Sequence, residues 1–169
     1  MGKVQRAAKA QGDVGPLAIS TIRVMVVATQ SAAAASGDIV GLVNLAVAES
    51  NQGYANSGVE ITLQLAGRYT TTYVESGSFS TDLTRFRGTT DGYMDSYHAT
   101  RNTITADVAV LLINNASSCG LASGIGSTAA TAFAVAHYGC ATGYYSFAHE
   151  IGHLQSARHD IATDPTLTP

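Results

Sequence analysis

The sequence is poor in charge and contains no tryptophan. Charged residues make up only 12% of the 169 residues, the formal net charge is −3, and no lysine follows Lys9. Because the chain has no basic cluster, it lacks the electrostatic footprint of a nucleic-acid-binding protein, and we expect no nucleic-acid partner. No apolar run approaches the length needed to cross a membrane, so we expect no membrane partner either.

The N-terminal segment also lacks the apolar stretch of a secretory signal. Residues 1–11 are basic, but no apolar region follows their charges, so any export signal is expected to lie outside this chain. Residues 1–20 show no clear periodicity and are predicted to be a lead-in. Residues 21–169 are long enough for one domain with a sizeable core, and no repeat or linker divides them.

Hydrophobic patterns predict strands and helices that alternate along the chain. Two nearly continuous apolar runs, 21–29 and 107–114, are typical of strands covered on both faces, and the second is the best candidate for the central strand. A small-residue stretch, 31–36, separates the first strand from a helix that Asp38 can cap. The order predicts a layered α/β domain with a mixed sheet. The further elements are strands at 60–73, 120–123 and 131–137, a helical region at 81–104 broken near 88–90, and a helix from about Thr142.

That last helix carries the strongest chemical signal in the sequence, an H-E-x-x-H pattern. His149 and His153 are four residues apart, so on a helix both imidazoles project from one face and can bind one ion. Glu150 is too close to His149 to be a comfortable third ligand. It is well placed to hydrogen-bond a water held by the metal.

A third histidine, His159, follows six residues after His153. A helix cannot bring it back over that gap, so the chain is expected to turn after Leu154. Three neutral imidazoles and a water would form the open four-coordinate site of catalytic zinc. The alternatives are a buried polar cluster without metal and a zinc site without catalysis.

The longer pattern H-E-x-x-H-x-x-G-x-x-H is the metzincin zinc signature, and the sequence matches it except at Ser156, where the family has glycine. That glycine normally turns the chain at positive φ. A serine there would cost about 1–2 kcal/mol, unless the turn is made differently.

Four separate runs show a closer resemblance, to the bacterial peptidyl-Asp metalloendopeptidases, which are similar to the reprolysin branch of metzincins. The resemblance implies a secreted or periplasmic zinc endopeptidase that cuts polypeptides on the amino side of aspartate. It also implies His149, His153 and His159 as zinc ligands and Glu150 as the catalytic base. Asp160 matches the aspartate after the third ligand, and Gly120, Leu121 and Ala122 match the edge strand that binds substrate. The runs are LVNLAVAESNQGYANSGV (42–59), DGYMDSYHATRN (91–102), CGLAS (119–123) and CATGYYSFAHEIGHLQSARHD (140–160).

One departure from the family concerns the C-terminal part. The family continues to a methionine-containing turn beneath the zinc and a further helix, whereas the last methionine here is Met94. We therefore expect residues 21–169 to be a metzincin-type catalytic domain whose C-terminal subdomain is truncated. A zinc-binding but catalytically silent fragment is the competing hypothesis. A nucleotide-binding protein has no support, because no G-x-G-x-x-G follows a strand.

The two cysteines, Cys119 and Cys140, flank the segment before the zinc helix. Two buried free thiols are one interpretation. An even count beside an extracellular-type protease motif favours a disulfide, which would stabilise the fold by roughly 3 kcal/mol.

Selecting aspartate after the cut requires a cation, best an arginine. Arg158 and Arg101 are the candidates, and a surface salt bridge is the alternative for each. His137 is expected to be half-buried or exposed, with contact to substrate as the alternative, and His98 to be structural or solvated. Tyr144 and Tyr145 either line the cleft or pack the zinc helix.

Overall fold

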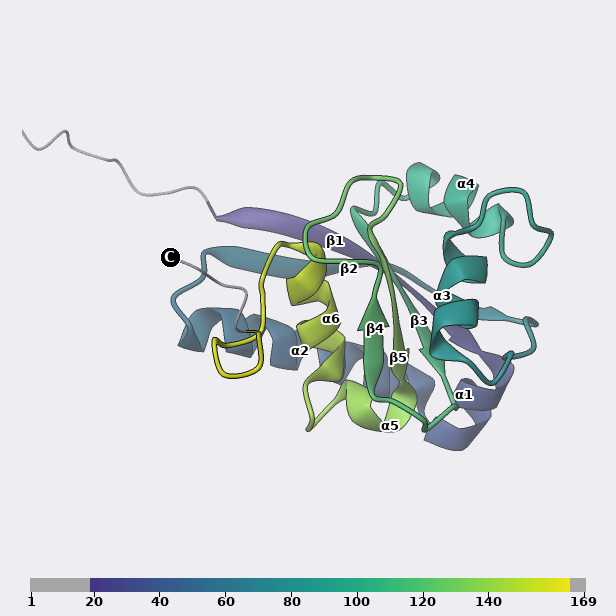
Figure 1. The fold of residues 1–169 in the computed structure, drawn as a ribbon, viewed down its shortest axis with the longest axis horizontal. Coiled ribbons are helices and arrows are strands. Elements are labelled where there is room, and N and C mark those ends of the chain that lie inside the picture. The colour runs from purple at the N-terminus through teal and green to yellow at the C-terminus, as the bar shows by residue number, and fades with distance from the viewer. Residues whose placement is uncertain (1–18, 165–169) are drawn as a thin grey trace, which may run out of the picture.

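The computed structural model describes residues 19–164, which form a layered α/β structure around one five-stranded sheet (Figure 1). The strand order is β2-β1-β3-β5-β4, and only β4 runs antiparallel to its neighbour. The predicted mixed sheet is confirmed, with β3 at its centre. The elements are β1 (Ser20–Thr29), α1 (Gln30–Ser36), α2 (Ile39–Asn56), β2 (Ile61–Thr71), α3 (Phe79–Arg87), α4 (Ser96–Thr103), β3 (Val108–Ile113), β4 (Gly120–Ala122), β5 (Phe133–His137), α5 (Tyr138–Ala141) and α6 (Ser146–Leu154).

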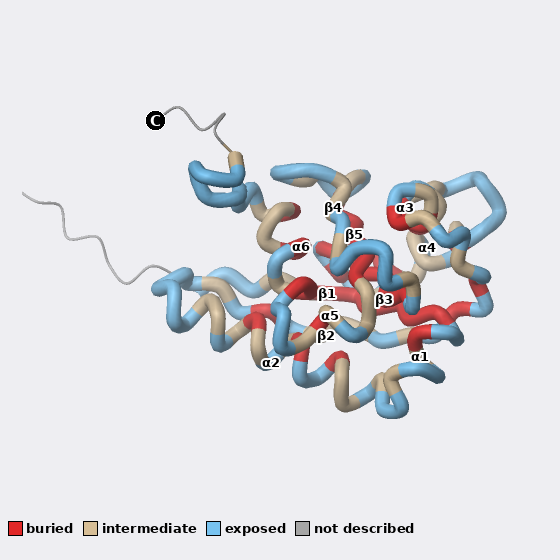
Figure 2. Tube along the Cα trace, turned by 60° about the horizontal axis from the view of Figure 1, so that its bottom comes forward, coloured by how far each residue is buried: buried red, intermediate tan, exposed pale blue. Residues whose placement is uncertain are grey.

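The central strands are buried because helices cover both faces of the sheet. In β1, Val24 and Val26 join the core beneath α1, α2, α5 and α6, whereas Met25 and Val27 join the core beneath α3 and α4. All six residues of β3 are buried as well. Figure 2 shows these strands as the buried centre of the structure. The apolar runs therefore predicted two-sided burial correctly.

Helix boundaries follow local capping. The side chain of Asp38 accepts the backbone N–H of Gly41 at 2.9 Å and begins α2, as predicted. The predicted break in the second helical region is also confirmed, since α3 ends at Arg87 and α4 begins at Ser96. Residues 1–18, most of the predicted lead-in, lie outside the described residues. Strand β1 begins at Ser20, one residue before the predicted start of the first strand.

One helix was missed, and one boundary prediction was wrong. The small-residue stretch 31–36 belongs to a helix, α1, because the hydroxyl of Thr29 accepts the N–H of Ala32 and caps it. The zinc-motif helix α6 begins at Ser146, not near Thr142, because Gly143 and Tyr145 adopt positive φ of 72° and 58° and interrupt the helical path. The short α5 lies before this interruption.

Among the described residues, no single helix is long and apolar enough to cross a membrane. The pair α1 and α2 meets the length and hydropathy test only when taken together, and an 86° bend separates the two helices.

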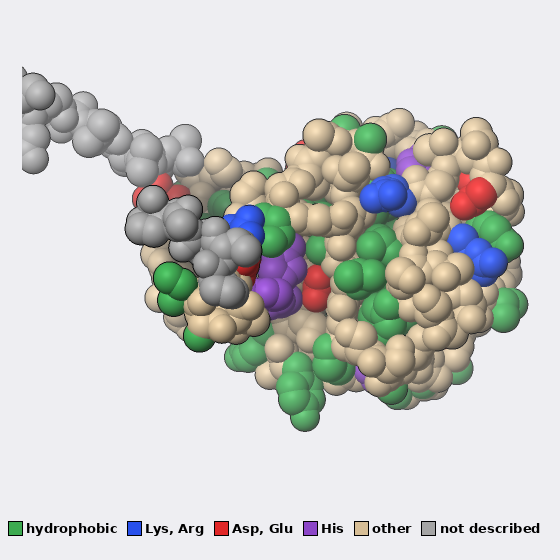
Figure 3. Space-filling view, viewed as in Figure 1, with side chains coloured by type: hydrophobic (Ala, Val, Ile, Leu, Met, Phe, Trp, Pro, Cys, Tyr) green, Lys and Arg blue, Asp and Glu red, His purple; other side chains and the backbone are tan. Residues whose placement is uncertain are grey.

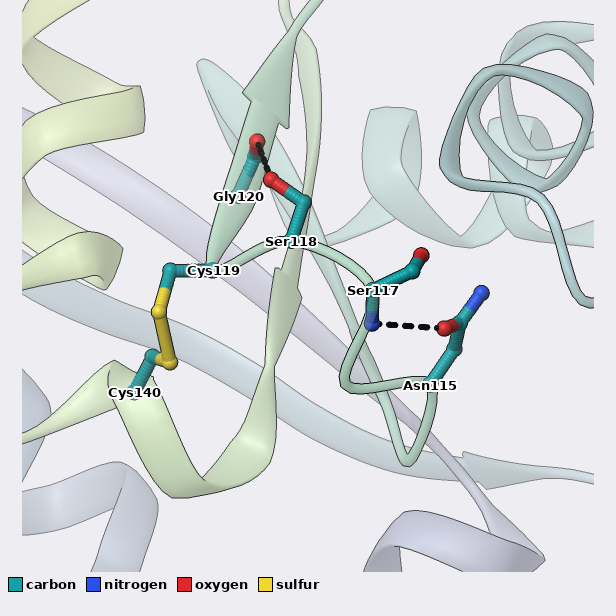
Figure 4. Close-up of a disulfide and its surroundings, with 6 residues drawn as sticks. All are labelled: Asn115, Ser117, Ser118, Cys119, Gly120 and Cys140. Atoms are coloured by element: carbon teal, nitrogen blue, oxygen red, sulfur yellow. Dashed lines mark hydrogen bonds between the residues drawn. A yellow bond between two sulfur atoms is a disulfide. The ribbon is translucent and has the colours of Figure 1, made fainter.

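A disulfide joins the edge of the sheet to the segment that leads into α6. Cys119 directly precedes β4, Cys140 lies in α5, and their sulfur atoms are 2.04 Å apart (Figure 4). The predicted bridge is confirmed and the interpretation as free thiols was wrong. The bridge closes a loop with a sequence separation of 21 residues that contains both β4 and β5.

The chain reverses direction directly after α6. Ser156 adopts φ of 79°, so the serine takes the left-handed conformation that the family's glycine would supply. The loop before β5 holds this helix end: the N–H of Gly126 donates to the carbonyl of His153, and the hydroxyl of Ser127 donates to that of Leu154, both at 2.8 Å. These bonds satisfy carbonyls at the helix C-terminus that have no partner within the helix.

Breaking the disulfide should destabilise the fold. Replacing Cys119 and Cys140 with alanine should lower the free energy of unfolding by about 3 kcal/mol, because the unfolded chain loses a covalent loop. Urea unfolding measures the change, and reductant should destabilise the native protein but not this variant. Two alkylatable thiols in native, unreduced protein would contradict the bridge.

Ser156→Gly should stabilise the protein by about 0.5–1 kcal/mol. Glycine adopts positive φ without the clash of a side chain, and this gain exceeds its extra entropy in the unfolded chain. Urea unfolding is again the measurement. As a control, Ser80→Gly on the exposed side of α3 should destabilise, since there φ is helical. Destabilisation by Ser156→Gly would show that the serine side chain stabilises the turn.

Candidate metal centre

Two of the three predicted ligands lie on one face of α6. His149 and His153 are one helical turn apart, and their Nε2 atoms lie 2.9 Å from each other. The reversal at Ser156 then brings in His159, whose Nε2 lies 3.1 Å from the Nε2 of each of the other two. The three imidazoles that were predicted to converge are thus brought together by the structure, as a group able to hold a metal ion.

The arrangement of these nitrogens fits a cation better than a hydrogen-bonded cluster. Three neutral imidazoles whose Nε2 atoms face one another cannot form three good hydrogen bonds, because each Nε2 either donates or accepts. The Nδ1 of His153 lies 2.9 Å from the carbonyl of Ala157, and an N–H donated there leaves the Nε2 lone pair for a ligand bond. Burial lowers the pKa of His149, and the charges of His153 and His159 lower it further, which favours the neutral, ligating form.

Glu150 lies beside the histidines in a largely dry environment. Its exposed fraction is 6%, and it lines a cavity of about 340 Å³ between α6 and β4 together with the three histidines. Burial raises the pKa of Glu150 to about 6, although His153 and the backbone N–H of Ala122 act in the opposite direction. Figure 3 shows histidine side chains gathered in a hollow beside an acidic side chain. A carboxyl group in this state can exchange a proton near neutral pH.

The opposite wall of the cavity is the edge strand β4. Gly120, Leu121 and Ala122 all line it, together with Gly124 and Ile125 from the loop that follows. Strand β4 pairs with β5 along one side only, so its other side is a free strand edge among the described residues. The structure therefore brings the predicted substrate-binding strand next to the predicted ligands and base.

Neither arginine candidate lines this cavity. Arg101 is buried at 7% exposure and donates to the carbonyls of Ala106, Ala129 and Asp107, so both interpretations of it, pocket cation and surface salt bridge, were wrong. Arg158 forms an ion pair with Asp164, with Nη2 2.6 Å and Nε 3.0 Å from Oδ2. The salt bridge weighed for Arg158 is thus present.

The remaining candidates lie at other positions. The ring of His98 packs against that of Phe133, with 5.0 Å between the ring centroids, so this histidine has a structural role between α4 and the sheet. His137 is half-buried, and its ring lies 4.8 Å from that of Tyr138. Asp160 caps the C-terminal turn by accepting the N–H groups of Ala162 and Thr163.

Tyr144 and Tyr145 do not pack into the core. They are 78% and 53% exposed, so neither side chain is buried against the zinc-motif helix, which was one of the two interpretations. Tyr145 instead lines a second cavity, of about 400 Å³, between α2 and α6. Its other lining residues include Glu49, Ala148 and His149, so His149 borders both cavities.

Sequence reasoning missed the contacts that support the site. The clamp from Gly126 and Ser127 onto the end of α6 has no motif, because it joins segments far apart in the chain. The second cavity beside Glu49 was missed for the same reason. The close approach of Gly120 to Glu150 was the one contact with a signal, since an isolated glycine in a strand indicates a close contact.

Comparisons with known proteins identify the family to which this chain belongs. The sequence model of the family described as Metallo-peptidase family M12 (Reprolysin_5) matches residues 19–168. The chain is 68% identical, over all of its length, to a Peptidyl-Asp metalloendopeptidase of Stenotrophomonas maltophilia strain R551-3. It is 71% identical, over 89% of its length, to the protein of that name from strain K279a. It spans 40% and 36% of the lengths of these two relatives.

A solved structure shares the fold. The crystal structure of metalloproteinase-II from Bacteroides fragilis superposes with a TM-score of 0.57 and 21% identity, over 85% of this chain and 44% of that one. The family match runs through every element of the sheet and through the three converging histidines. The chain therefore belongs to metallo-peptidase family M12.

Proposed function

We propose that this chain carries the catalytic centre of a zinc-dependent endopeptidase. The observation that supports this most is the convergence of three Nε2 atoms beside a buried carboxyl group, in a cavity whose other wall is a free strand edge. The membership of family M12 and the relatives' names agree with it.

His149, His153 and His159 would hold the ion. Three imidazole nitrogens with room for a further ligand are the donor set of catalytic zinc, and the cavity beside them supplies that room. When bound, zinc would supply Lewis acidity, which polarises a carbonyl group and acidifies water. The hydrogen bond from Nδ1 of His153 to Ala157 would fix that ring for binding.

Glu150 would act as general base and then as general acid. Its carboxylate would accept a proton from the attacking water and would donate that proton to the nitrogen of the departing amine. The raised pKa, about 6, suits a group that must both take up and release a proton near neutral pH.

A substrate would bind in extended form along β4. No strand pairs with the outer side of β4 among the described residues, so an extended peptide can add there as a further strand. Two backbone groups on this side already have partners, which a peptide would share or replace: the N–H of Ala122 donates to Glu150, and the carbonyl of Gly120 accepts the hydroxyl of Ser118. Gly120 and Ala122 lie on the same cavity as Glu150, so this pairing would place a peptide bond next to the base. Leu121, which is 36% exposed, would contact substrate side chains.

A preference for aspartate would need a cation near the metal centre. The relatives are named peptidyl-Asp enzymes, and a carboxylate is best bound by an arginine. Arg158 follows the reversal after α6 and already binds a carboxylate, that of Asp164. We propose that a substrate aspartate competes for this guanidinium.

We further propose that the protein works outside the bacterial cytoplasm. The disulfide between Cys119 and Cys140 supports this, since such bonds persist in oxidising compartments.

Glu150→Gln should retain the metal and lose activity. The amide cannot accept a proton, so turnover of a peptide substrate should fall about 100-fold or more, while zinc stays at one ion per chain. Peptide cleavage and metal analysis give the two readouts, and a chelator should abolish the wild-type activity. The control Glu60→Gln, at an exposed position, should behave as wild type. A wild-type chain that binds zinc and cleaves nothing would support the silent fragment instead.

Arg158→Ala should reduce the discrimination between aspartate and asparagine. The wild type should cleave on the amino side of aspartate in a peptide and cleave the matched asparagine peptide poorly. Loss of a charge-assisted hydrogen bond should reduce this ratio of kcat/KM values about tenfold or more. Arg68→Ala, on the exposed side of β2, serves as the control. An unchanged preference in Arg158→Ala would remove Arg158 from the proposal.

A further inference from the structure

Gly120 and Glu150 approach each other so closely that no side chain fits between them. A Cβ atom placed on Gly120 would lie 2.7 Å from both Cγ and Cδ of Glu150, and nearer still to Oε1. These are the three nearest heavy atoms, and all of them belong to the same carboxylic side chain. The space that a side chain at position 120 would need is therefore filled by Glu150.

The backbone does not require glycine at this position. Gly120 is absent from the described residues that have positive φ, and it begins a regular strand whose register pairs it with Ala136. Alanine is compatible with such a backbone and would normally reduce the entropy of the unfolded chain. The contact with Glu150 is thus the obstacle to a side chain here.

Glu150 has little freedom to move aside. It is 6% exposed, and its neighbours on α6, Phe147 and Ile151, are fully buried and fix the helix against the sheet. Because the clash includes Cγ, rotation of the terminal carboxylate alone would not relieve it. The whole side chain would have to change rotamer, which would take the carboxylate away from the N–H of Ala122 that lowers its pKa.

We propose that Gly120 is a positioning residue for Glu150. The absence of a side chain on the first residue of β4 lets the carboxylate lie against the strand edge, between the three histidines and the place proposed for the substrate. Strand β4 thus has two tasks: it presents backbone groups to a peptide, and it determines where the base is held. The consequence for catalysis rests on the proposed function, whereas the contact itself can be tested without activity.

The test is Gly120→Ala in three backgrounds, with thermal unfolding of the metal-free chain as the readout. With Glu150 present, the added Cβ clashes, and the melting temperature should fall by about 3 °C or more. Glutamine has the same size and shape as glutamate, so with Glu150→Gln the same clash and a similar fall in melting temperature are expected. With Glu150→Ala the obstructing atoms are gone, and Gly120→Ala should be neutral or raise the melting temperature.

Gly124→Ala is the matched control for stability. It lies just beyond β4, its φ is not positive, and a Cβ there would meet no atom within 4 Å. Its effect on the melting temperature should be the same in all three backgrounds. If Gly120→Ala also has one constant effect, the two positions are not coupled and the proposal is wrong.

Peptide cleavage then tests the consequence for catalysis. Gly120→Ala should retain one zinc per chain, and kcat should fall at least tenfold while KM stays within about twofold, because the base is displaced and the metal is not. Wild-type kcat in Gly120→Ala would overturn the positioning role. A wild-type chain without activity would contradict the proposed function, whereas the unfolding measurements would still decide whether Gly120 positions Glu150.

Discussion

The candidate site depends on one chain reversal, which lies directly after α6. Helical geometry alone brings His149 and His153 together, but His159 reaches them only because the backbone turns at Ser156 with φ of 79°. The helix end on which this turn rests is held by Gly126 and Ser127 from the loop before β5. The position of His159 beside the other two histidines therefore depends both on the end of α6 and on the loop before β5, which comes from an earlier part of the chain.

The sheet supplies the second half of the arrangement. Within the sheet formed by residues 19–164, β4 is the one antiparallel strand and lies at the edge, so it pairs with β5 on one side and with no strand on the other. The disulfide joins the residue before this strand to α5, and α5 leads into α6. This covalent link limits how far β4 and the start of the zinc-motif helix can move apart. Glu150 lies between them, where burial raises its pKa and β4 leaves room for its carboxylate.

Much of this could be predicted from the sequence, because the signals are local. The spacing of His149 and His153 and the apolar runs of β1 and β3 need only the geometry of one helix or strand. The start of α6 was predicted wrongly because it depends on the positive φ of Tyr145, a conformation that is uncommon for a bulky residue. Arg101 was misjudged because its partners are backbone carbonyls, two just after α4 and one in the loop before β5, and a backbone acceptor has no residue type that a sequence pattern can show. Contacts between distant segments have no signature in a single sequence.

We infer that the three Nε2 atoms form one zinc site. Anomalous diffraction from crystals of the zinc-loaded chain, measured on both sides of the zinc absorption edge, tests this inference. We expect one anomalous peak within bonding distance of Nε2 of His149, His153 and His159, and close to the carboxylate of Glu150. A peak bound by two histidines with the ring of His159 turned away, or no peak between them, would contradict it.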